Sequence, residues 1–217
     1  MKPWELRRTV AAFFYPNRCP FCDGLIGMRD FWCPGCIGRL SLLEDIRDIP
    51  GGLDGFSEVC RYSGAARTAI LRMKRGCFRS PIEAIAVLMA ENAAELIGCA
   101  DVITAIPSSR KRRRELGYAQ SEEIAKLISR MSGKPFRRFL AVNPGKSEQK
   151  RLTAEERREN AYKAFRIIPG TDIGGARVLL IDDVCATGST LSAAAELLKG
   201  SGASEVYGAV FAKSVRR

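Results

Sequence analysis

The sequence of 217 residues contains no histidine. A histidine general base, a serine–histidine–aspartate triad and a histidine-ligated metal are therefore all excluded. Long hydrophobic runs are absent too, because no stretch approaches the eighteen or so apolar residues of a membrane-spanning helix. An apolar content of 46% and a charged content of 27% are typical of a soluble globular protein. We therefore expect a folded chain that does not insert into a membrane.

We also expect no cleavable secretory signal. The apolar run at 9–15 is short, and no small-residue cleavage site follows it. Leu6, Val10 and Phe13 instead predict a short helix with one apolar face. Without a secretory signal the cysteine thiols should stay reduced, so we expect a cytoplasmic protein.

Positive charge is concentrated in one stretch. Residues 107–158 hold 15 Lys and Arg against 6 Asp and Glu, which is +9 of the net charge of +11. Such a concentration predicts a polyanionic partner, either a diphosphorylated substrate or nucleic acid. A solvated surface is the alternative, because charge runs are usually that. The densest part is a run of five cations: Arg110, Lys111, Arg112, Arg113 and Arg114.

Four of the eight cysteines form two pairs, CPFC and CPGC, with ten residues between them. Each pair presents two sulfurs from one tight turn, so the spacing predicts a tetrahedral four-thiolate zinc site. Two disulfides or an iron–sulfur cluster are the alternatives. Because all four ligands are protein thiolates, zinc would be structural, with no position left for substrate. The predicted ligands are Cys19, Cys22, Cys33 and Cys36.

Strand and helix patterns alternate from about residue 56 onward, which predicts an α/β fold with a mostly parallel sheet. The patterns include buried strands at 101–106 and 177–181 and helices at 81–97, 119–131 and 189–200. We predict two domains. Residues 1–50 would form an N-terminal helix and a four-cysteine zinc-binding domain, and residues 51–217 the α/β domain.

The stretch VLLIDDVCATGST at 178–190 joins a buried strand to two acids and a turn of small residues. Ligands of open parallel sheets bind at the carboxyl ends of strands, where Asp182 and Asp183 are expected. The turn enters a helix, whose free N–H groups can hold a phosphate. Ribose hydroxyls on the acids and a 5-phosphate on the turn would suit both halves. The predicted phosphate cradle is Ala186, Thr187, Gly188, Ser189 and Thr190.

Over all its positions this stretch resembles the phosphoribosyl pyrophosphate signature of type I phosphoribosyltransferases. With a four-cysteine ribbon before it, the chain resembles the ComF family of bacterial natural transformation. Residues 62–76, 105–128 and 149–165 are similar to further stretches of that family, including its basic loop. Two departures stand out. Residues 106–108 keep one of the family's two prolines, and residues 116–120 lack its arginine and asparagine.

The resemblance implies a type I phosphoribosyltransferase-like fold that binds phosphoribosyl pyrophosphate with Mg²⁺. In that reaction a nitrogen nucleophile displaces pyrophosphate from C1 of the ribose. Asp182 and Asp183 would hold the ribose hydroxyls, directly or through Mg²⁺ and water. Lys74 and Arg75 are candidates for the pyrophosphate, with a solvated basic turn as the alternative. The segment 143–160 sits where the family carries a mobile flap, with a plain solvated helix as the alternative.

No pocket for a nitrogen acceptor is recognisable in the sequence, which keeps two further functions open. The chain could be a non-catalytic competence factor that binds partner proteins and, through residues 110–114, single-stranded DNA. It could also be a regulator that is switched by the ligand. The family's role in DNA uptake further implies an ATP-driven DNA translocase as partner.

Overall fold

The computed structural model describes residues 16–40, 42, 49–75, 80–143 and 164–214. Their centre is a four-stranded sheet of order β1-β6-β5-β2. β6 pairs with β1 and β5, and β5 also pairs with β2, always in parallel. The predicted α/β fold with a mostly parallel sheet is thereby confirmed. The strands are β1 (Gly55–Arg61), β2 (Val102–Ala105), β5 (Arg177–Cys185) and β6 (Glu205–Lys213).

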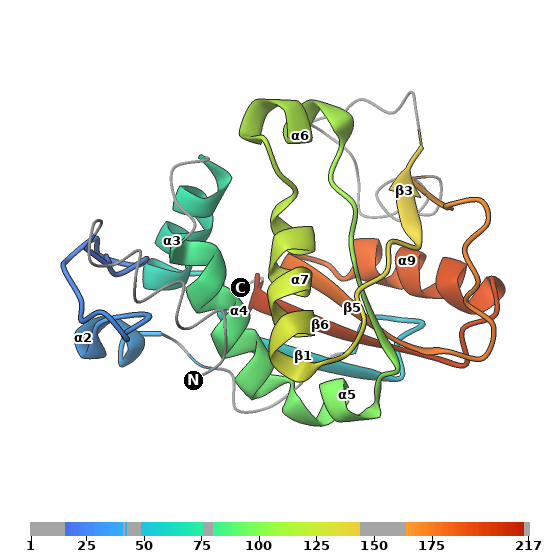
Figure 1. Ribbon diagram of the computed structural model, residues 1–217, viewed down its shortest axis with the longest axis horizontal. Helices are drawn as coiled ribbons and strands as arrows, with labels where there is room; N and C mark the ends of the chain where they lie inside the picture. The colour runs from blue at the N-terminus through green and yellow to red at the C-terminus, as the bar shows by residue number, and fades with distance from the viewer. Residues whose placement is uncertain (1–15, 41, 43–48, 76–79, 144–163, 215–217) are drawn as a thin grey trace.

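Helices cover both faces of this sheet (Figure 1). Leu179 and Ile181 of β5 pack on one face, whereas Val178 and Leu180 pack on the other. Successive side chains of a strand point to opposite faces of the sheet. A strand that is buried on both faces therefore has a continuous run of apolar residues. The helices of the first face are α3 (Gly64–Lys74), α4 (Ser80–Asn92), α5 (Ala94–Cys99) and α7 (Gln120–Ser132), and that of the second is α9 (Ser189–Gly200).

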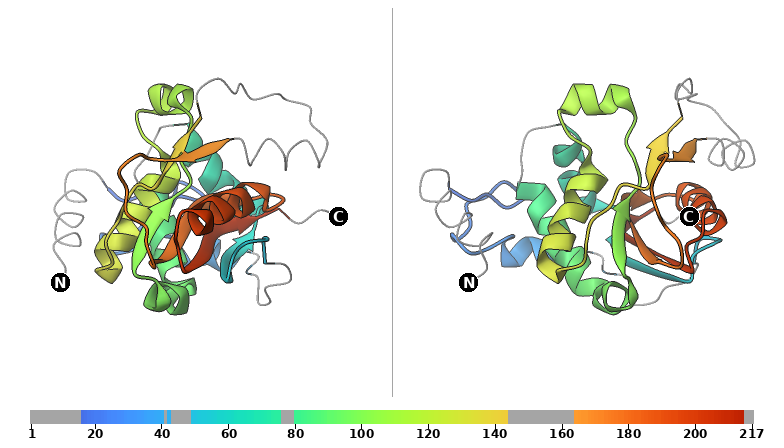
Figure 2. Two further views of the ribbon diagram at one scale, coloured as in Figure 1. Left: turned by 90° about the vertical axis from the view of Figure 1, so that its right-hand side faces the viewer. Right: turned by 45° about the vertical axis from the view of Figure 1, so that its right-hand side comes forward.

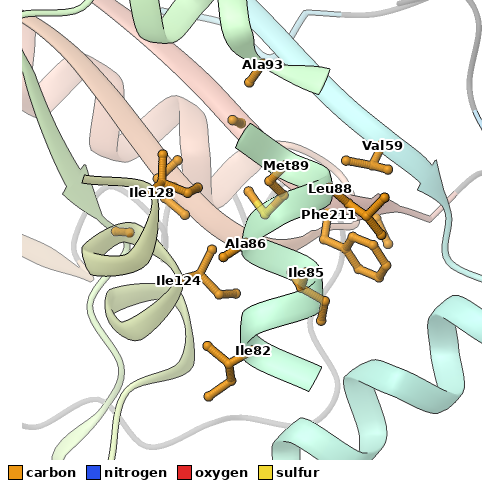
Figure 3. Packing of buried hydrophobic residues seen from close by; sticks show 14 of the residues in the cluster. Val59, Ile82, Ile85, Ala86, Leu88, Met89, Ala93, Ile124, Ile128 and Phe211 are labelled. Atoms are coloured by element: carbon orange, nitrogen blue, oxygen red, sulfur yellow. The ribbon is translucent and has the colours of Figure 1, made fainter. Parts of the chain in front are cut away.

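The larger core lies where α4 and α7 pack side by side on the sheet (Figure 3). Its fully buried side chains include Ile85 and Met89 of α4, Ile124 and Ile128 of α7 and Phe211 of β6. Burying each such side chain contributes about 1.5–3 kcal/mol. A helix that is apolar on most sides belongs inside a protein, which explains why α4 is the central helix of this layer.

Two helix ends show how well local sequence predicted the elements. The helix expected over 81–97 is broken into α4 and α5, because Ala93 between them adopts φ −96° and ψ 20°. α7 ends as expected at Gly133, which has φ 75° and donates its N–H to the carbonyl of Ser129. Glycine takes this left-handed conformation without steric cost.

A second, two-stranded sheet pairs β3 (Leu140–Val142) antiparallel with β4 (Phe165–Ile167). α6 (Arg110–Leu116) projects from the body of the protein at the same end as β3 (Figures 1 and 2). The basic run, which the family resemblance placed in a loop, is therefore the start of a helix. All but one residue of the predicted flap at 143–160 lie outside the described residues.

The cysteine-rich segment, residues 16–40, lies beside α3 (Figure 1). It contains one short helix, α2 (Pro34–Ile37), and an antiparallel bridge between Arg18 and Leu25. Cys19 and Phe21 are buried in the same apolar cluster as residues of α3 and α4. The segment therefore packs directly on the α/β body, and the domain boundary at residue 50 stays a prediction. Among the described helices, none is long and apolar enough to cross a membrane.

Candidate functional site

β5 continues four residues beyond its partner β2. The pairing with β2 ends at Ala105 and Ile181, but β5 runs on along β6 until Cys185 lies opposite Lys213. Asp182 and Asp183 therefore lie inside a strand, and the expectation that the strand ends before them was wrong. The extra length comes from β6, which offers backbone hydrogen-bond partners to these residues. Because β2 has ended, the edge of β5 is open at the two acids.

A cavity of about 190 Å³ lies at this open edge. It is smaller than the roughly 300–1,000 Å³ of drug-sized sites, so it suits a group the size of a sugar or a diphosphate. The basic helix α6 connects two of its walls in the chain: residues 106–109 precede the helix, and residues 120–121 follow it. The lining residues are Ile106, Pro107, Ser108, Ser109, Gln120, Ser121, Asp182 and Asp183.

Gln120 carries a buried donor in the cavity wall. Its side chain is 3% exposed, and its Nε2 has no hydrogen-bond partner among the described residues. An unsatisfied buried donor costs about 1–3 kcal/mol, so a ligand oxygen in the cavity would relieve that cost. The sequence prediction did not include Gln120 among the site residues. Its place at the start of a helix, just after the basic run, was the signal that could have identified it.

Asp182 is buried, and both of its hydrogen bonds are made by Oδ1. This oxygen accepts from Ser121 Oγ at 2.8 Å and from the Asp183 N–H at 2.9 Å. Burial and the adjacent charge of Asp183 raise the pKa of Asp182 to about 7, although the two hydrogen bonds and Lys74 act in the opposite direction. The acidic pair can therefore hold a proton near neutral pH, which reduces its repulsion of a phosphorylated ligand.

Lys74 lies at the acidic pair. Its Nζ is 2.8 Å from Asp183 Oδ2, with only 25% of the lysine side chain exposed. The preceding residue, Met73, accepts a hydrogen bond at 2.8 Å from the hydroxyl of Tyr118. The end of α3 is thus held beside the cavity, where Lys74 can reach a ligand. Arg75, which was predicted together with Lys74, is exposed at the C-cap of α3.

The turn after β5 has the geometry of a helix entrance. Gly188 is the N-cap of α9 with φ 79°, and a Cβ at this position would lie 3.0 Å from Cβ of Pro50. Both the dihedral angle and the close contact require glycine. The hydroxyls of Thr187 and Ser189 lie 2.9 Å apart next to the first N–H groups of the helix. Two other members of the turn, Ala186 and Thr190, are exposed.

The basic run on α6 is partly engaged within the fold. Arg113 Nη2 lies 3.4 Å from Oε2 of the buried Glu122, which also forms ion pairs with Lys126 and Arg138. Burial raises the pKa of Glu122, but hydrogen bonds from Arg138 and Lys126 outweigh it and hold that pKa below its usual range. Arg114 is exposed, and the side chains of residues 110–112 lie outside the described part. The sequence did not predict this network.

The four predicted metal ligands come together. Their Sγ atoms all lie within 4.8 Å of one another, and those of Cys22 and Cys33 are 3.8 Å apart. A tetrahedral zinc site with Zn–S distances of about 2.3 Å has S···S edges of about 3.8 Å, so the donor set fits zinc. All four are free cysteines, and the 3.8 Å between Cys22 and Cys33 is too long for a disulfide. The same four thiolates would also suit an iron–sulfur cluster.

Backbone N–H groups favour the thiolate form of Cys19, whereas burial and the neighbouring thiols raise the pKa of Cys36. The N–H of Cys33 points at Cys19 Sγ, with a separation of 3.5 Å. Burial raises the pKa of Cys19, but the N–H groups of Cys33, Cys22 and Phe21 outweigh it and lower that pKa to about 7. A thiolate is the form that binds metal, so the backbone of this turn prepares the site.

Residues 142–216 match the family described as phosphoribosyl transferase domain. The chain is 30% identical over 108 residues to "Competence protein F" of Haemophilus influenzae, which covers 49% of this chain and 47% of that protein. It is 38% identical over 72 residues to "Adenine phosphoribosyltransferase" of Desulforamulus reducens, which covers 33% of this chain and 41% of that protein. The chain thus spans less than half the length of these two curated relatives.

Two similar solved structures are phosphoribosyltransferases. That of adenine phosphoribosyltransferase from Leishmania tarentolae has a TM-score of 0.42 at 18% identity and covers 75% of this chain and 78% of that chain. That of orotate phosphoribosyltransferase from Aeropyrum pernix has a TM-score of 0.39 at 17% identity and covers 61% and 59%. With the family match and the parallel sheet, the chain has a type I phosphoribosyltransferase-like fold with an N-terminal four-cysteine cluster.

The cysteine cluster predicts the effect of removing one ligand. Cys22→Ser should weaken zinc binding by more than about 100-fold, because loss of an outer-shell partner alone costs 10–100-fold. Zinc per protein, measured by elemental analysis after dialysis against a weak chelator, should fall well below one. Cys99→Ser is the matched control, because Cys99 is exposed and lies outside the cluster. Equal zinc content in the two variants would contradict the assignment.

The raised pKa of Asp182 predicts that a neutral side chain at this position stabilises the protein more at high pH than at low pH. Between about pH 4 and pH 7 the folded protein binds more protons at this group than the unfolded chain, so stability falls as pH rises through that window. Asp182→Asn removes the ionisation and keeps an oxygen acceptor. The variant should therefore be more stable than wild type by on the order of 2–4 kcal/mol at pH 8 but hardly at pH 4.5.

Urea unfolding of both proteins at several pH values measures this difference. Glu91→Gln, on the exposed side of α4, is the control and should follow wild type at every pH. Parallel stability curves for wild type and Asp182→Asn would show that Asp182 ionises normally.

Proposed function

We propose that this chain, which is a ComF-like protein with a phosphoribosyl transferase domain, binds phosphoribosyl pyrophosphate or a related ribose 5-phosphate ligand. The observation that carries the proposal is the junction of β5 and α9. There a buried Asp182 and a partly buried Asp183 border a cavity, and a left-handed glycine three residues past Cys185 opens a helix. Acceptors for hydroxyl groups and donors for a phosphate thus lie a few residues apart on one turn.

Each half of this turn fits one part of the ligand. Asp182 and Asp183 accept hydrogen bonds from the vicinal ribose hydroxyls. Residues 186–190 hold the 5-phosphate with backbone N–H groups and hydroxyls, aided by the dipole of α9. Lys74 exchanges its contact with Asp183 for the diphosphate, because both are anions within reach of the same ammonium.

Mg²⁺ accompanies the diphosphate in this proposal, and it would neutralise the charge of the leaving pyrophosphate. The fit is one of chemistry, since the cavity is lined by carboxylate, hydroxyl and amide oxygens, which a hard cation prefers. Gln120, with its buried unpaired Nε2, donates to a ligand oxygen in the same cavity.

A site of this kind would support phosphoribosyl transfer. A nitrogen acceptor forms a bond to C1 of the ribose while the bond from C1 to the pyrophosphate oxygen breaks, and pyrophosphate leaves with the electron pair. The protein's part is to orient the ribose and to stabilise the charge that develops on the leaving group. The identity of the acceptor defines which phosphoribosyltransferase this would be.

The second candidate is a competence factor that handles single-stranded DNA in the cytoplasm, next to an ATP-driven DNA translocase. The observation that favours it is α6, a projecting helix that begins with five consecutive cations (Figure 1). Each residue turns the helix by about 100°, so these cations are distributed around α6, and those on its solvent side can contact a phosphate backbone. α6 rises from the rim of the ligand cavity, so ligand and DNA sites would be neighbours on the same protein.

Ligand binding is tested by calorimetric titration with phosphoribosyl pyrophosphate and Mg²⁺. Wild type should bind in the micromolar range, and the double change Asp182→Asn, Asp183→Asn should weaken binding by at least about 100-fold, because two charged acceptors are lost. The matched control is Glu91→Gln, Glu95→Gln, which neutralises two exposed acids on α4 and α5. Failure of wild type to bind at millimolar ligand would refute the proposal.

DNA binding is tested by fluorescence anisotropy of a labelled oligonucleotide at several salt concentrations. Replacing residues 111–114 by alanine should abolish most binding and flatten the salt dependence, because each lost phosphate contact reduces the slope by about 0.7. The same variant should still bind phosphoribosyl pyrophosphate, and the double aspartate variant should still bind DNA. Loss of both activities in each folded variant would show that the two sites are not separate.

A further inference from the structure

We propose that metal binding at the cysteine cluster tightens ligand binding at Asp183, through the last turn of α3. Arg72 is the positioning residue for this effect, and it acts through Lys74. The inference rests on the proposed function for its ligand, but the contacts that carry it are present without one. The cysteine-rich segment and the candidate site both contact the same end of one helix.

Arg72 joins α3 to the first cysteine turn. Its Nη1 donates to the carbonyl of Cys19 at 3.4 Å and to that of Pro20 at 3.3 Å. The same nitrogen lies 3.8 Å from Asp23 Oδ1, and 28% of the Arg72 side chain is exposed. One guanidinium therefore holds three oxygens of a single turn, and that turn also carries two of the four metal ligands.

Lys74, two residues later, holds the other side of the same helix end. Residues two apart on a helix point in nearly opposite directions, because each residue turns the helix by about 100°. Lys74 thus faces Asp183 while Arg72 faces the cysteine turn. Between them Met73 is fully buried, and its carbonyl accepts the hydroxyl of Tyr118. The end of α3 is thus held by contacts on three sides.

The cysteine turn is a structure that the metal would stabilise. It is closed by backbone hydrogen bonds from Cys19 N–H to the Gly24 carbonyl and from Asp23 N–H to the Cys19 carbonyl, both of 2.8 Å. Without a metal, the cysteines join the two turns only by weak contacts to sulfur, from the Cys33 N–H to Cys19 Sγ at 3.5 Å and between the thiols of Cys22 and Cys33 at 3.8 Å. A metal would fix the turn whose carbonyls Arg72 binds more firmly than these contacts do. Because Arg72 and Lys74 share one helix turn, the position of the Lys74 ammonium depends on this cysteine turn.

A second contact links the region after the cysteine segment to the phosphate cradle. Pro50 packs against Gly188, where an added Cβ would meet it at 3.0 Å. The next residue, Gly51, lies near Ser192 in the first turn of α9. Residues 50–52 therefore run along the first turns of α9.

Coupling of this kind is reciprocal. If metal binding raises the affinity for the ligand by some factor, ligand binding must raise the affinity for the metal by the same factor. The test compares zinc-loaded Arg72→Met with zinc-loaded Arg67→Met. Methionine keeps most of the side-chain length and removes the donors. Arg67 is the matched control, because it lies on the exposed side of the same helix. Should Arg72→Met not retain zinc, Arg72→Lys replaces it, since lysine keeps the charge but not the planar fork.

Two readouts are taken from each variant at equal zinc content. Titration with phosphoribosyl pyrophosphate and Mg²⁺ should show about tenfold weaker binding for Arg72→Met than for Arg67→Met, a typical coupling factor. Hydrogen exchange without ligand should be faster in Arg72→Met at residues 70–75 and 180–190. Stripping zinc should weaken ligand binding of wild type and Arg67→Met by the same factor and change that of Arg72→Met little.

The readouts separate failure of this inference from failure of the proposed function. If zinc-loaded wild type binds no phosphoribosyl pyrophosphate, the proposed function is wrong, and hydrogen exchange alone decides the coupling. Faster exchange at 180–190 in Arg72→Met only would support the coupling. Equal affinity and equal exchange in Arg72→Met and Arg67→Met would overturn it.

Discussion

The parallel pairing of β5 with β6 is the constraint on which the candidate site depends. It carries β5 past the end of β2, so that two acidic residues lie in a hydrogen-bonded strand with one open edge. A strand is rigid where a loop is not, and the acids are therefore held in place before any ligand binds. The same pairing delivers Gly188 to the entrance of α9, because the turn starts where β5 leaves β6.

Adjacent carboxylates at a buried position would normally be unfavourable, and the surrounding residues reduce that cost in three ways. Lys74 neutralises Asp183, Ser121 donates to Asp182, and the raised pKa of Asp182 allows the pair to share a proton near pH 7. Each of these compensations can be exchanged for a contact to a ligand. The protein thus supplies, in the free state, contacts to the acidic pair that a bound ligand can replace.

The positive charge of the chain is less available than its sequence indicates. Glu122 is buried among Arg113, Lys126 and Arg138, so part of the basic stretch is used to satisfy one interior carboxylate. A buried charge needs such partners, since its desolvation is costly. The positive charge that is left to bind a polyanion lies on α6, which projects at the rim of the cavity. The candidate ligand site and the helix proposed to contact DNA thus lie at one end of the molecule, and α3 joins the candidate site to the cysteine cluster.

Patterns in the sequence by themselves determined the parallel α/β fold, the four-cysteine cluster and the place of the acidic pair before a helix. These depend on periodicity and short spacing, which are local properties. Only the tertiary structure decided that β5 continues to Cys185, that Lys74 meets Asp183, that Gln120 lines the cavity and that Arg72 binds the cysteine turn. These contacts join elements far apart in the chain, and helix packing on the sheet, which no short sequence pattern encodes, brings them together.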